Sequence, residues 1–180
     1  INDRATREFF CLNEYFGLHK DDVVFFEQSM LPCLDNEGKI ILETKDKVSM
    51  APNGNGGIWT QIKDDGISLQ MKENGIKYVH VFSIDNALTR PADPLFIGYC
   101  INEKADCGNK VLWKSHALEK VGVIAEINSK PLVIEYSDMD KSLCEEIDES
   151  GKLAFGAGNI CNHFFTTDFI LDSIIPTLDD

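Results

Sequence analysis

The run from Ser49 to Gly57 contains residue types that could hold a nucleotide. It reads Ser-Met-Ala-Pro-Asn-Gly-Asn-Gly-Gly, with three glycines and two asparagines in its last five positions. Glycine lets a ligand approach the main chain closely, and free backbone amides at the start of a helix suit a phosphate or the edge of a uracil ring. A Gly-rich turn that leads into a helix at Ile58 explains the same residues equally well. This segment alone leaves both interpretations open.

Two carboxylates stand at the ends of predicted strands. Asp85 follows the run 78–84, which is predicted to be a central strand, and α/β sheets bind ligands at the carboxyl ends of their strands. Mg²⁺ is usually held by one or two carboxylates plus substrate phosphates, so one aspartate is chemically sufficient. Glu135 could accept bonds from two sugar hydroxyls, with Tyr136 as a flat wall beside it. From position alone, a turn-capping aspartate and an exposed strand-end glutamate are the preferred interpretations.

A glycine and an asparagine in the later part of the chain are further candidates. Gly122 lies in a predicted strand, where a glycine marks either the close approach of a ligand or a bulge. Asn159 carries a donor and an acceptor at a predicted strand-to-helix junction, which suits an acetamido or hydroxyl group or simply a helix cap. The four histidines and six cysteines show no spacing typical of a zinc site, so we expect reduced, structural thiols.

These residues need a scaffold, and the sequence predicts alternating helices and strands. Their order implies an α/β layer structure around a mixed sheet. Asn128, Ser129 and Lys130 are predicted to form a hairpin turn, and Asp93 is predicted to cap a helix that has Pro94 in its first turn. The predicted helices cover 3–16, 58–73 with a break at 64–66, 94–104, a segment from 137 or 138 to 147, and 160–175; the predicted strands are 23–27, 39–43, 78–84, 110–114, 121–127, 132–136 and 153–157.

Composition restricts the partners of this chain. Its 180 residues include 17 Lys plus Arg against 30 Asp plus Glu, a formal net charge of −13. Such a charge argues against nucleic acid or an anionic membrane as a partner. No apolar run is long enough to cross a bilayer and the start has no signal-peptide pattern, so a cytoplasmic location fits best. An enzyme for phosphorylated substrates would need Mg²⁺ or basic residues from outside this stretch to act against that charge.

Short motifs along nearly the whole chain resemble eukaryotic UDP-N-acetylglucosamine pyrophosphorylases. The form Ala-Pro-Asn-Gly-Asn-Gly-Gly is the specific part, because the related UDP-glucose enzymes carry a different loop that contains histidine. Gly156 departs from the pattern, since related enzymes commonly have a polar residue there. The segments that carry the resemblance are 25–32, 47–57, 80–81, 85–86, 92–94, 105–108, 121–123, 135–137, 157–160 and 162–165.

The resemblance implies a Rossmann-like nucleotidyltransferase core, with residues 1–180 forming part of one catalytic domain that is incomplete at both ends. The family's N-terminal Gly-rich phosphate loop and its C-terminal domain are expected to be missing. The implied reaction joins UTP and N-acetylglucosamine 1-phosphate to give UDP-N-acetylglucosamine and pyrophosphate, with Mg²⁺ as cofactor. The residues implied to hold the nucleotide are Gln28, Met50, Gly54, Asn55 and Asp85, the last also on the metal side, and those implied to hold the sugar are Gly122, Glu135, Tyr136 and Asn159.

Some alternatives stay open at the level of sequence. Gln28 could serve only the backbone of the loop, and Met50 could be core filler. A non-catalytic sugar-nucleotide-binding or regulatory module would keep the same glycine loop and sugar pocket. A dinucleotide-dependent oxidoreductase is disfavoured, because no Gly-x-Gly-x-x-Gly follows a predicted strand. We expect the 180 residues alone to bind substrate weakly and to turn over poorly or not at all.

Overall fold

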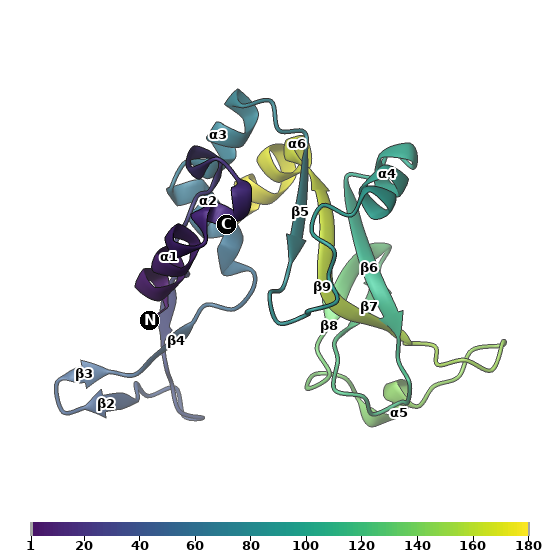
Figure 1. Ribbon diagram of the computed structural model, residues 1–180. Helices are drawn as coiled ribbons and strands as arrows, with labels where there is room; N and C mark the ends of the chain where they lie inside the picture. The colour runs from purple at the N-terminus through teal and green to yellow at the C-terminus, as the bar shows by residue number, and fades with distance from the viewer. Residues whose placement is uncertain (1, 180) are drawn as a thin grey trace. The chain divides into compact units, whose positions relative to one another are not determined.

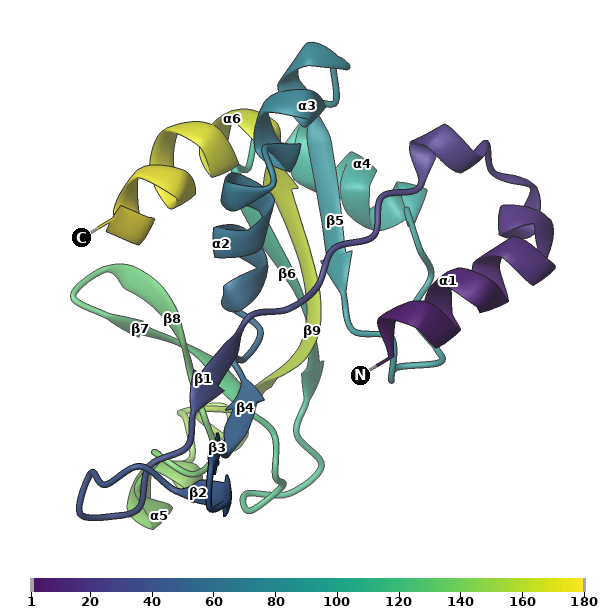
Figure 2. The same cartoon turned by 90° about the vertical axis from the view of Figure 1, so that its left-hand side faces the viewer.

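The computed structural model describes residues 2–179, which form two compact units. The first unit runs to Glu73 and includes the segment from Ser173 onward, and the second unit is Asn74–Asp172. Helices and strands are labelled in Figure 1, and Figure 2 shows the same ribbon from another side. No helix among the described residues is long and apolar enough to cross a membrane.

The first unit consists of short helices and two small strand pairs. Strand β1 pairs with β4 and β2 pairs with β3, both antiparallel. Its elements are α1 (Asp3–Leu12), the 3₁₀ turns η1 (Glu14–Gly17) and η2 (Lys20–Asp22), β1 (Met30–Pro32), β2 (Leu42–Thr44), β3 (Lys47–Val48), β4 (Met50–Pro52), α2 (Gly57–Asp64), α3 (Ile67–Glu73) and the 3₁₀ turn η4 (Ile175–Asp179).

Aromatic packing ends the first helix earlier than its apolar spacing predicts. Tyr15 and Phe16 have left-handed backbones with φ of 50° and 55°, so the chain reverses after α1. The Phe10 ring then contacts two other rings edge-on, with centroid distances of 5.3 Å to Phe16 and 5.1 Å to Phe25. The strand predicted for 23–27 is wrong, because Phe25 is used in this cluster and that segment pairs with no strand in the described chain.

The second unit is built on one antiparallel sheet. Strand β9 is its organising element, since it pairs with β5, β6 and β7 (Figures 1 and 2). The elements are β5 (Tyr78–Phe82), α4 (Pro94–Asn102), β6 (Cys107–Trp113), β7 (Val123–Ile127), β8 (Lys130–Ile134), α5 (Lys141–Cys144), β9 (Ala157–Thr166), α6 (Thr167–Phe169) and the π-helical η3 (Ile170–Ile174), whose last two residues belong to the first unit. The α/β class is confirmed, and every strand pair among the described residues is antiparallel, so the expected mixed sheet has no parallel pair here.

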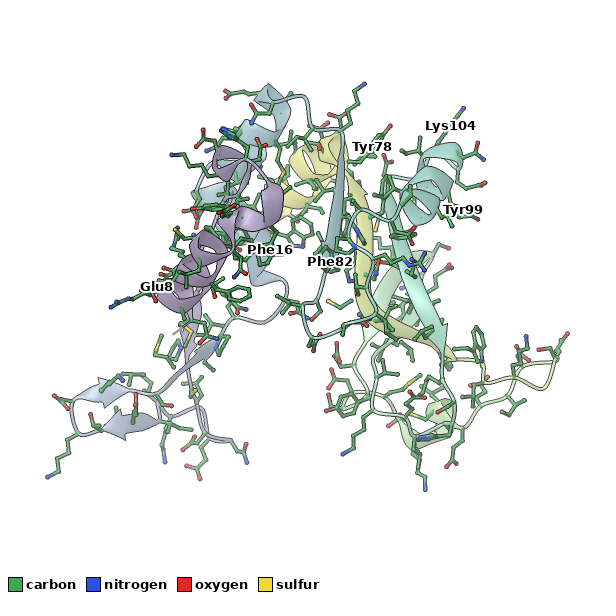
Figure 3. All side chains as sticks on the ribbon, viewed as in Figure 1. Glu8, Phe16, Tyr78, Phe82, Tyr99 and Lys104 are labelled. Atoms are coloured by element: carbon green, nitrogen blue, oxygen red, sulfur yellow. The ribbon has the colours of Figure 1, made fainter. Side chains whose placement is uncertain are left out.

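Two sequence predictions about this sheet are wrong. The helix predicted from 160 is a strand up to Thr166, because pairing with three other strands and full burial of Phe164 outweigh the helical spacing of its apolar residues. The helix starts only at Thr167, where the Thr166 hydroxyl accepts a bond from the Phe169 amide. The second wrong prediction is that the segment 78–84 forms a central strand. Strand β5 pairs only with β9 in the described chain and is therefore an edge strand, with Tyr78 and Phe82 at its two ends (Figure 3).

The predicted cap of α4 is confirmed. Asp93 is 7% exposed, and its Oδ1 accepts a bond from the Leu95 amide at 3.2 Å while Pro94 fills the first turn. Its Oδ2 accepts a bond from Lys110 Nζ at 2.7 Å, which ties the start of the helix to strand β6. This bond with Lys110 holds the pKa of the Asp93 carboxyl below its ordinary value of 3.8.

The ion pair of Asp93 gives a pH-dependent stability. A carboxylate whose pKa is lowered by folding contributes stability above its ordinary pKa and loses it as the pH falls through the folded-state value. Asparagine can still cap the helix, so Asp93→Asn removes mainly the charge. We expect it to lower the urea midpoint at neutral pH, and the difference in midpoint from the native chain should disappear below pH 3.8. Urea titrations from neutral to acid pH measure this difference, and Lys110→Met should reduce the pH dependence over the same range. A difference that stays constant would contradict the assignment.

Candidate functional site

The glycine loop of the first unit is held from one side by the residues just before β1. The amide of Asn53 donates to the Ser29 carbonyl at 3.0 Å, and its Nδ2 donates to Ser29 Oγ at 3.1 Å. Gln28 Nε2 donates to the Gly54 carbonyl at 2.7 Å. Gly54 has a left-handed backbone with φ of 64°, which a side chain would strain. The loop therefore has a fixed conformation just before α2.

Of the residues predicted to hold the nucleotide, Gln28, Met50, Gly54 and Asn55 lie in the first unit and Asp85 lies in the second. Gln28 and Gly54 are in direct contact, and Asn55 follows in the same loop. One N–H of the Gln28 amide binds the loop backbone, so this residue has the structural role that the sequence left open. Its contact with a nucleotide stays a prediction. Met50 on β4 is 44% exposed, so core filler is the wrong interpretation in this structure.

A second group of candidates surrounds one position in strand β9 of the second unit. The Ser83 amide donates to the Cys161 carbonyl at 3.1 Å, and Ser83 Oγ donates to Asp85 Oδ1. Burial raises the pKa of the Cys161 thiol, and the negative charges of Asp85 and Glu135 raise it further. Ser83 therefore connects Asp85 to the backbone of Cys161. Sequence reasoning had assigned Cys161 only a structural role, and no local signal marks it.

The predicted sugar-side residues meet at the same position. The Asn159 amide donates to the Gly122 carbonyl at 2.7 Å, and Asn159 Oδ1 accepts a bond from the Cys161 amide at 3.0 Å. A β-carbon on Gly122 would lie 3.3 Å from both carboxylate oxygens of Glu135, so the glycine leaves room for that side chain. Tyr136 follows and is 51% exposed. The structure thus connects Asp85, through Ser83 and Cys161, with Asn159, and Asn159, through Gly122, with Glu135.

This second group offers polar atoms suited to a sugar and oxygens suited to a hard cation. The Glu135 carboxylate can accept bonds from hydroxyls, while the Asn159 oxygen is already occupied by Cys161, which leaves its NH₂ group as a donor. No group of three or more His, Cys, Asp or Glu side chains among residues 2–179 could hold a metal by itself. A cation at Asp85 would therefore need oxygens from a ligand. At Gly156, a side chain would overlap the indole of Trp113, which explains why no polar residue fits there.

This chain is similar to several known sugar-nucleotide enzymes. The family model described as UTP–glucose-1-phosphate uridylyltransferase matches residues 2–175. The UDP-N-acetylhexosamine pyrophosphorylase-like protein 1 of Xenopus tropicalis is 46% identical over 97% of this chain and 35% of its own length. The UDP-N-acetylglucosamine pyrophosphorylase of Saccharomyces cerevisiae is 42% identical over 92% of this chain and 35% of its own length.

Solved structures show the same likeness. The uridine diphosphate N-acetylglucosamine pyrophosphorylase from Trypanosoma brucei, in complex with inhibitor, superposes with a TM-score of 0.87 at 34% identity, over 99% of this chain and 36% of that one. A putative UDP-N-acetylglucosamine pyrophosphorylase from Entamoeba histolytica gives 0.81 at 35% identity, over 94% and 42%. The chain spans about a third of the length of the curated relatives it matches.

Proposed function

Because this chain belongs to the UTP–glucose-1-phosphate uridylyltransferase family, we propose that it supplies the uridine- and sugar-binding parts of a UDP-N-acetylglucosamine pyrophosphorylase. The reaction joins UTP and N-acetylglucosamine 1-phosphate into UDP-N-acetylglucosamine and pyrophosphate. The observation that carries the proposal is the set of contacts in the second unit that connects Asp85, Asn159 and Glu135 through Ser83, Cys161 and Gly122. Relatives that are 42–46% identical and carry this enzyme name or a closely related one support the choice of sugar.

The reaction is a direct displacement at phosphorus. A phosphate oxygen of the sugar phosphate attacks the α-phosphorus of UTP, the bond from that phosphorus to its bridging oxygen breaks, and pyrophosphate leaves. No covalent intermediate with the protein is needed. The contribution of this chain is positioning: the glycine loop holds the uridine, and the residues around Cys161 hold the amino sugar.

Asp85 is the residue that we assign to Mg²⁺. Its side chain is exposed and one carboxylate oxygen is bound by the Ser83 hydroxyl, which fixes the side chain and leaves its second oxygen for a cation. A single carboxylate fits Mg²⁺, which prefers hard oxygens and completes its shell with substrate phosphates and water. When bound, Mg²⁺ would supply positive charge at the phosphates, which a chain of net charge −13 otherwise lacks.

The bond from Gln28 to the glycine loop makes a testable contribution to nucleotide binding. We expect Gln28→Ala to weaken the binding of UMP about fivefold, since a lost hydrogen bond of about 1 kcal/mol frees the Gly54 carbonyl and loosens the loop. Isothermal titration of UMP measures this affinity. Gln70→Ala, which removes an exposed glutamine from α3 in the same unit, should leave it unchanged. Equal losses in both variants would show that the bond to Gly54 does not hold the nucleotide loop.

Two measurements together test the proposed function. The first is the binding of UDP-N-acetylglucosamine to the 180-residue chain, compared with UDP-glucose. The second is the release of pyrophosphate from UTP and N-acetylglucosamine 1-phosphate with Mg²⁺, measured on this chain and on one extended at both ends to the length of its relatives. We expect preferred binding of the N-acetyl sugar and turnover in the extended chain. Binding without turnover in either chain would favour a non-catalytic sugar-nucleotide module, and an absence of binding would overturn both.

A further inference from the structure

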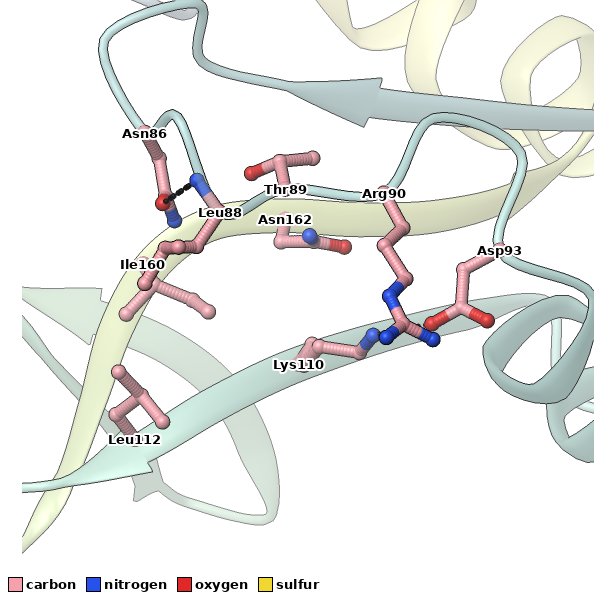
Figure 4. Close-up of a pocket in the computed structure, with 9 residues that line it drawn as sticks. All are labelled: Asn86, Leu88, Thr89, Arg90, Asp93, Lys110, Leu112, Ile160 and Asn162. Atoms are coloured by element: carbon pink, nitrogen blue, oxygen red, sulfur yellow. Dashed lines mark hydrogen bonds and ion pairs between the residues drawn. The ribbon is translucent and has the colours of Figure 1, made fainter.

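A pocket of about 390 Å³ lies in the second unit, under the loop that connects β5 with α4 (Figure 4). Residues 86–93 form one side, and strands β6 and β9 form the other. None of the residues assigned above to the nucleotide, the sugar or Mg²⁺ lines it. The pocket is therefore a separate feature, although its loop begins directly after Asp85.

The pocket carries one positive charge that the described chain does not neutralise. Lys110 Nζ is paired with Asp93 at 2.7 Å and also lies 5.1 Å from the centre of the Phe96 ring. The Arg90 guanidinium points toward the same end of the pocket (Figure 4). No carboxylate of residues 2–179 forms an ion pair with Arg90. An unpaired guanidinium in a chain of net charge −13 favours a ligand with a single negative charge.

The remaining polar groups of the pocket are able to donate hydrogen bonds. Asn86 Oδ1 already accepts from the Leu88 amide at 3.1 Å, as Figure 4 shows, which leaves its NH₂ group. The Ala92 amide donates to His80 Nδ1, so His80 Nε2 carries the proton and donates to Asn162 Oδ1 at 2.8 Å. Because the Asn162 oxygen accepts this bond, the NH₂ group of Asn162 remains as a donor, and the residue is only 2% exposed.

A hydroxyl in the same pocket has no partner at all among the described residues. Thr89 Oγ1 is buried and forms no hydrogen bond. A buried hydroxyl without a partner costs stability unless a ligand or water meets it. Together with Arg90 and the Asn162 NH₂ group, it can donate to oxygens that carry negative charge.

The other end of the pocket is apolar. Leu88, Leu112 and Ile160 line it, and Leu88 and Leu112 are 92% and 64% exposed. A ligand that covers these side chains would remove apolar surface from water. A molecule with one carboxylate group and a short branched hydrocarbon tail matches both ends of the pocket.

We propose that this pocket binds a small organic monocarboxylate, with the carboxylate at Arg90 and Thr89 and the tail on Leu88, Leu112 and Ile160. Two-dimensional ¹H–¹⁵N NMR titration of the 180-residue chain tests this with isovalerate, the neutral isovaleramide and the tail-less acetate. We expect isovalerate to bind most tightly and to shift the amides of 86–93, with both other compounds binding about tenfold more weakly. Equal binding of isovaleramide, or shifts confined to other residues, would overturn the proposal.

Substitutions separate the head group from general surface effects. Arg90→Gln should weaken isovalerate binding about tenfold, and Thr89→Val, which keeps the side-chain shape, should weaken it about threefold. Lys120→Gln removes an exposed cation of the same unit that does not line the pocket, and it should leave the affinity unchanged. Isovalerate affinity that survives Arg90→Gln in a chain with a native spectrum would overturn the assignment.

Discussion

Phe164→Ala is expected to lower the free energy of unfolding by about 3–5 kcal/mol, the largest stability effect we predict for this chain. Phe164 is 0% exposed and its ring stacks on Tyr78 with centroids 5.6 Å apart. It lies opposite His80 on β5 and opposite Gly108 on β6, at the point where β9 joins two strands. Removing the ring would leave a cavity between these strands, since paired backbones cannot close over it.

Urea denaturation followed by circular dichroism measures this loss, and Phe82→Ala is the matched control. Phe82 lies in the same sheet but is 38% exposed, so we expect its removal to cost about 1 kcal/mol. If Phe164→Ala loses so much unfolding free energy that it does not fold, Phe164→Leu supplies the measurement instead. That variant is expected to cost about 1.5 kcal/mol or less. Similar losses for positions 164 and 82 would mean that the junction of the three strands is not the centre of the core.

The long strand through Phe164 also shows what sequence patterns cannot predict. The hairpin at Asn128 and Ser129 was predicted correctly because it is local, and both residues adopt the positive φ values, 52° and 61°, that such a turn requires. Strand β9 was predicted as a helix because its partners β5 and β6 lie far away along the chain. Apolar spacing carries no information about strands that are so remote in sequence.

The sequence indicated only part of the candidate site, because the contacts that shape it join residues that are remote along the chain. The glycine loop could be recognised from residue types alone, whereas the bond between Gln28 and Gly54 joins residues 26 positions apart. The connection from Asp85 to Asn159 runs through Cys161, whose left-handed backbone, φ 52°, lies where the register between β6 and β9 shifts. Residue patterns do not encode such an irregularity, so the role of this cysteine became visible only in the structure.

Asn159→Asp is expected to weaken the binding of UDP-N-acetylglucosamine by about 30- to 100-fold, or about 2–3 kcal/mol, while leaving the fold intact. The new carboxylate can still accept the bond from the Cys161 amide, and the bond from the Asn159 amide to Gly122 involves only backbone. The substitution removes the NH₂ donor that we assign to the sugar and adds a negative charge near Glu135 and Asp85. Isothermal titration with UDP-N-acetylglucosamine and with uridine distinguishes a loss of sugar binding from a loss of uridine binding.

Uridine affinity should stay native in Asn159→Asp, because the residues assigned to uracil and ribose belong to the other unit. Asn128→Asp adds the same charge at the hairpin turn of the second unit and should change neither affinity. Thermal unfolding of both variants establishes that the fold is retained before the affinities are compared. If Asn159→Asp bound UDP-N-acetylglucosamine as tightly as the native chain, the amide would serve only to brace Cys161, and the recognition of the sugar would have to rest on Glu135 and Tyr136.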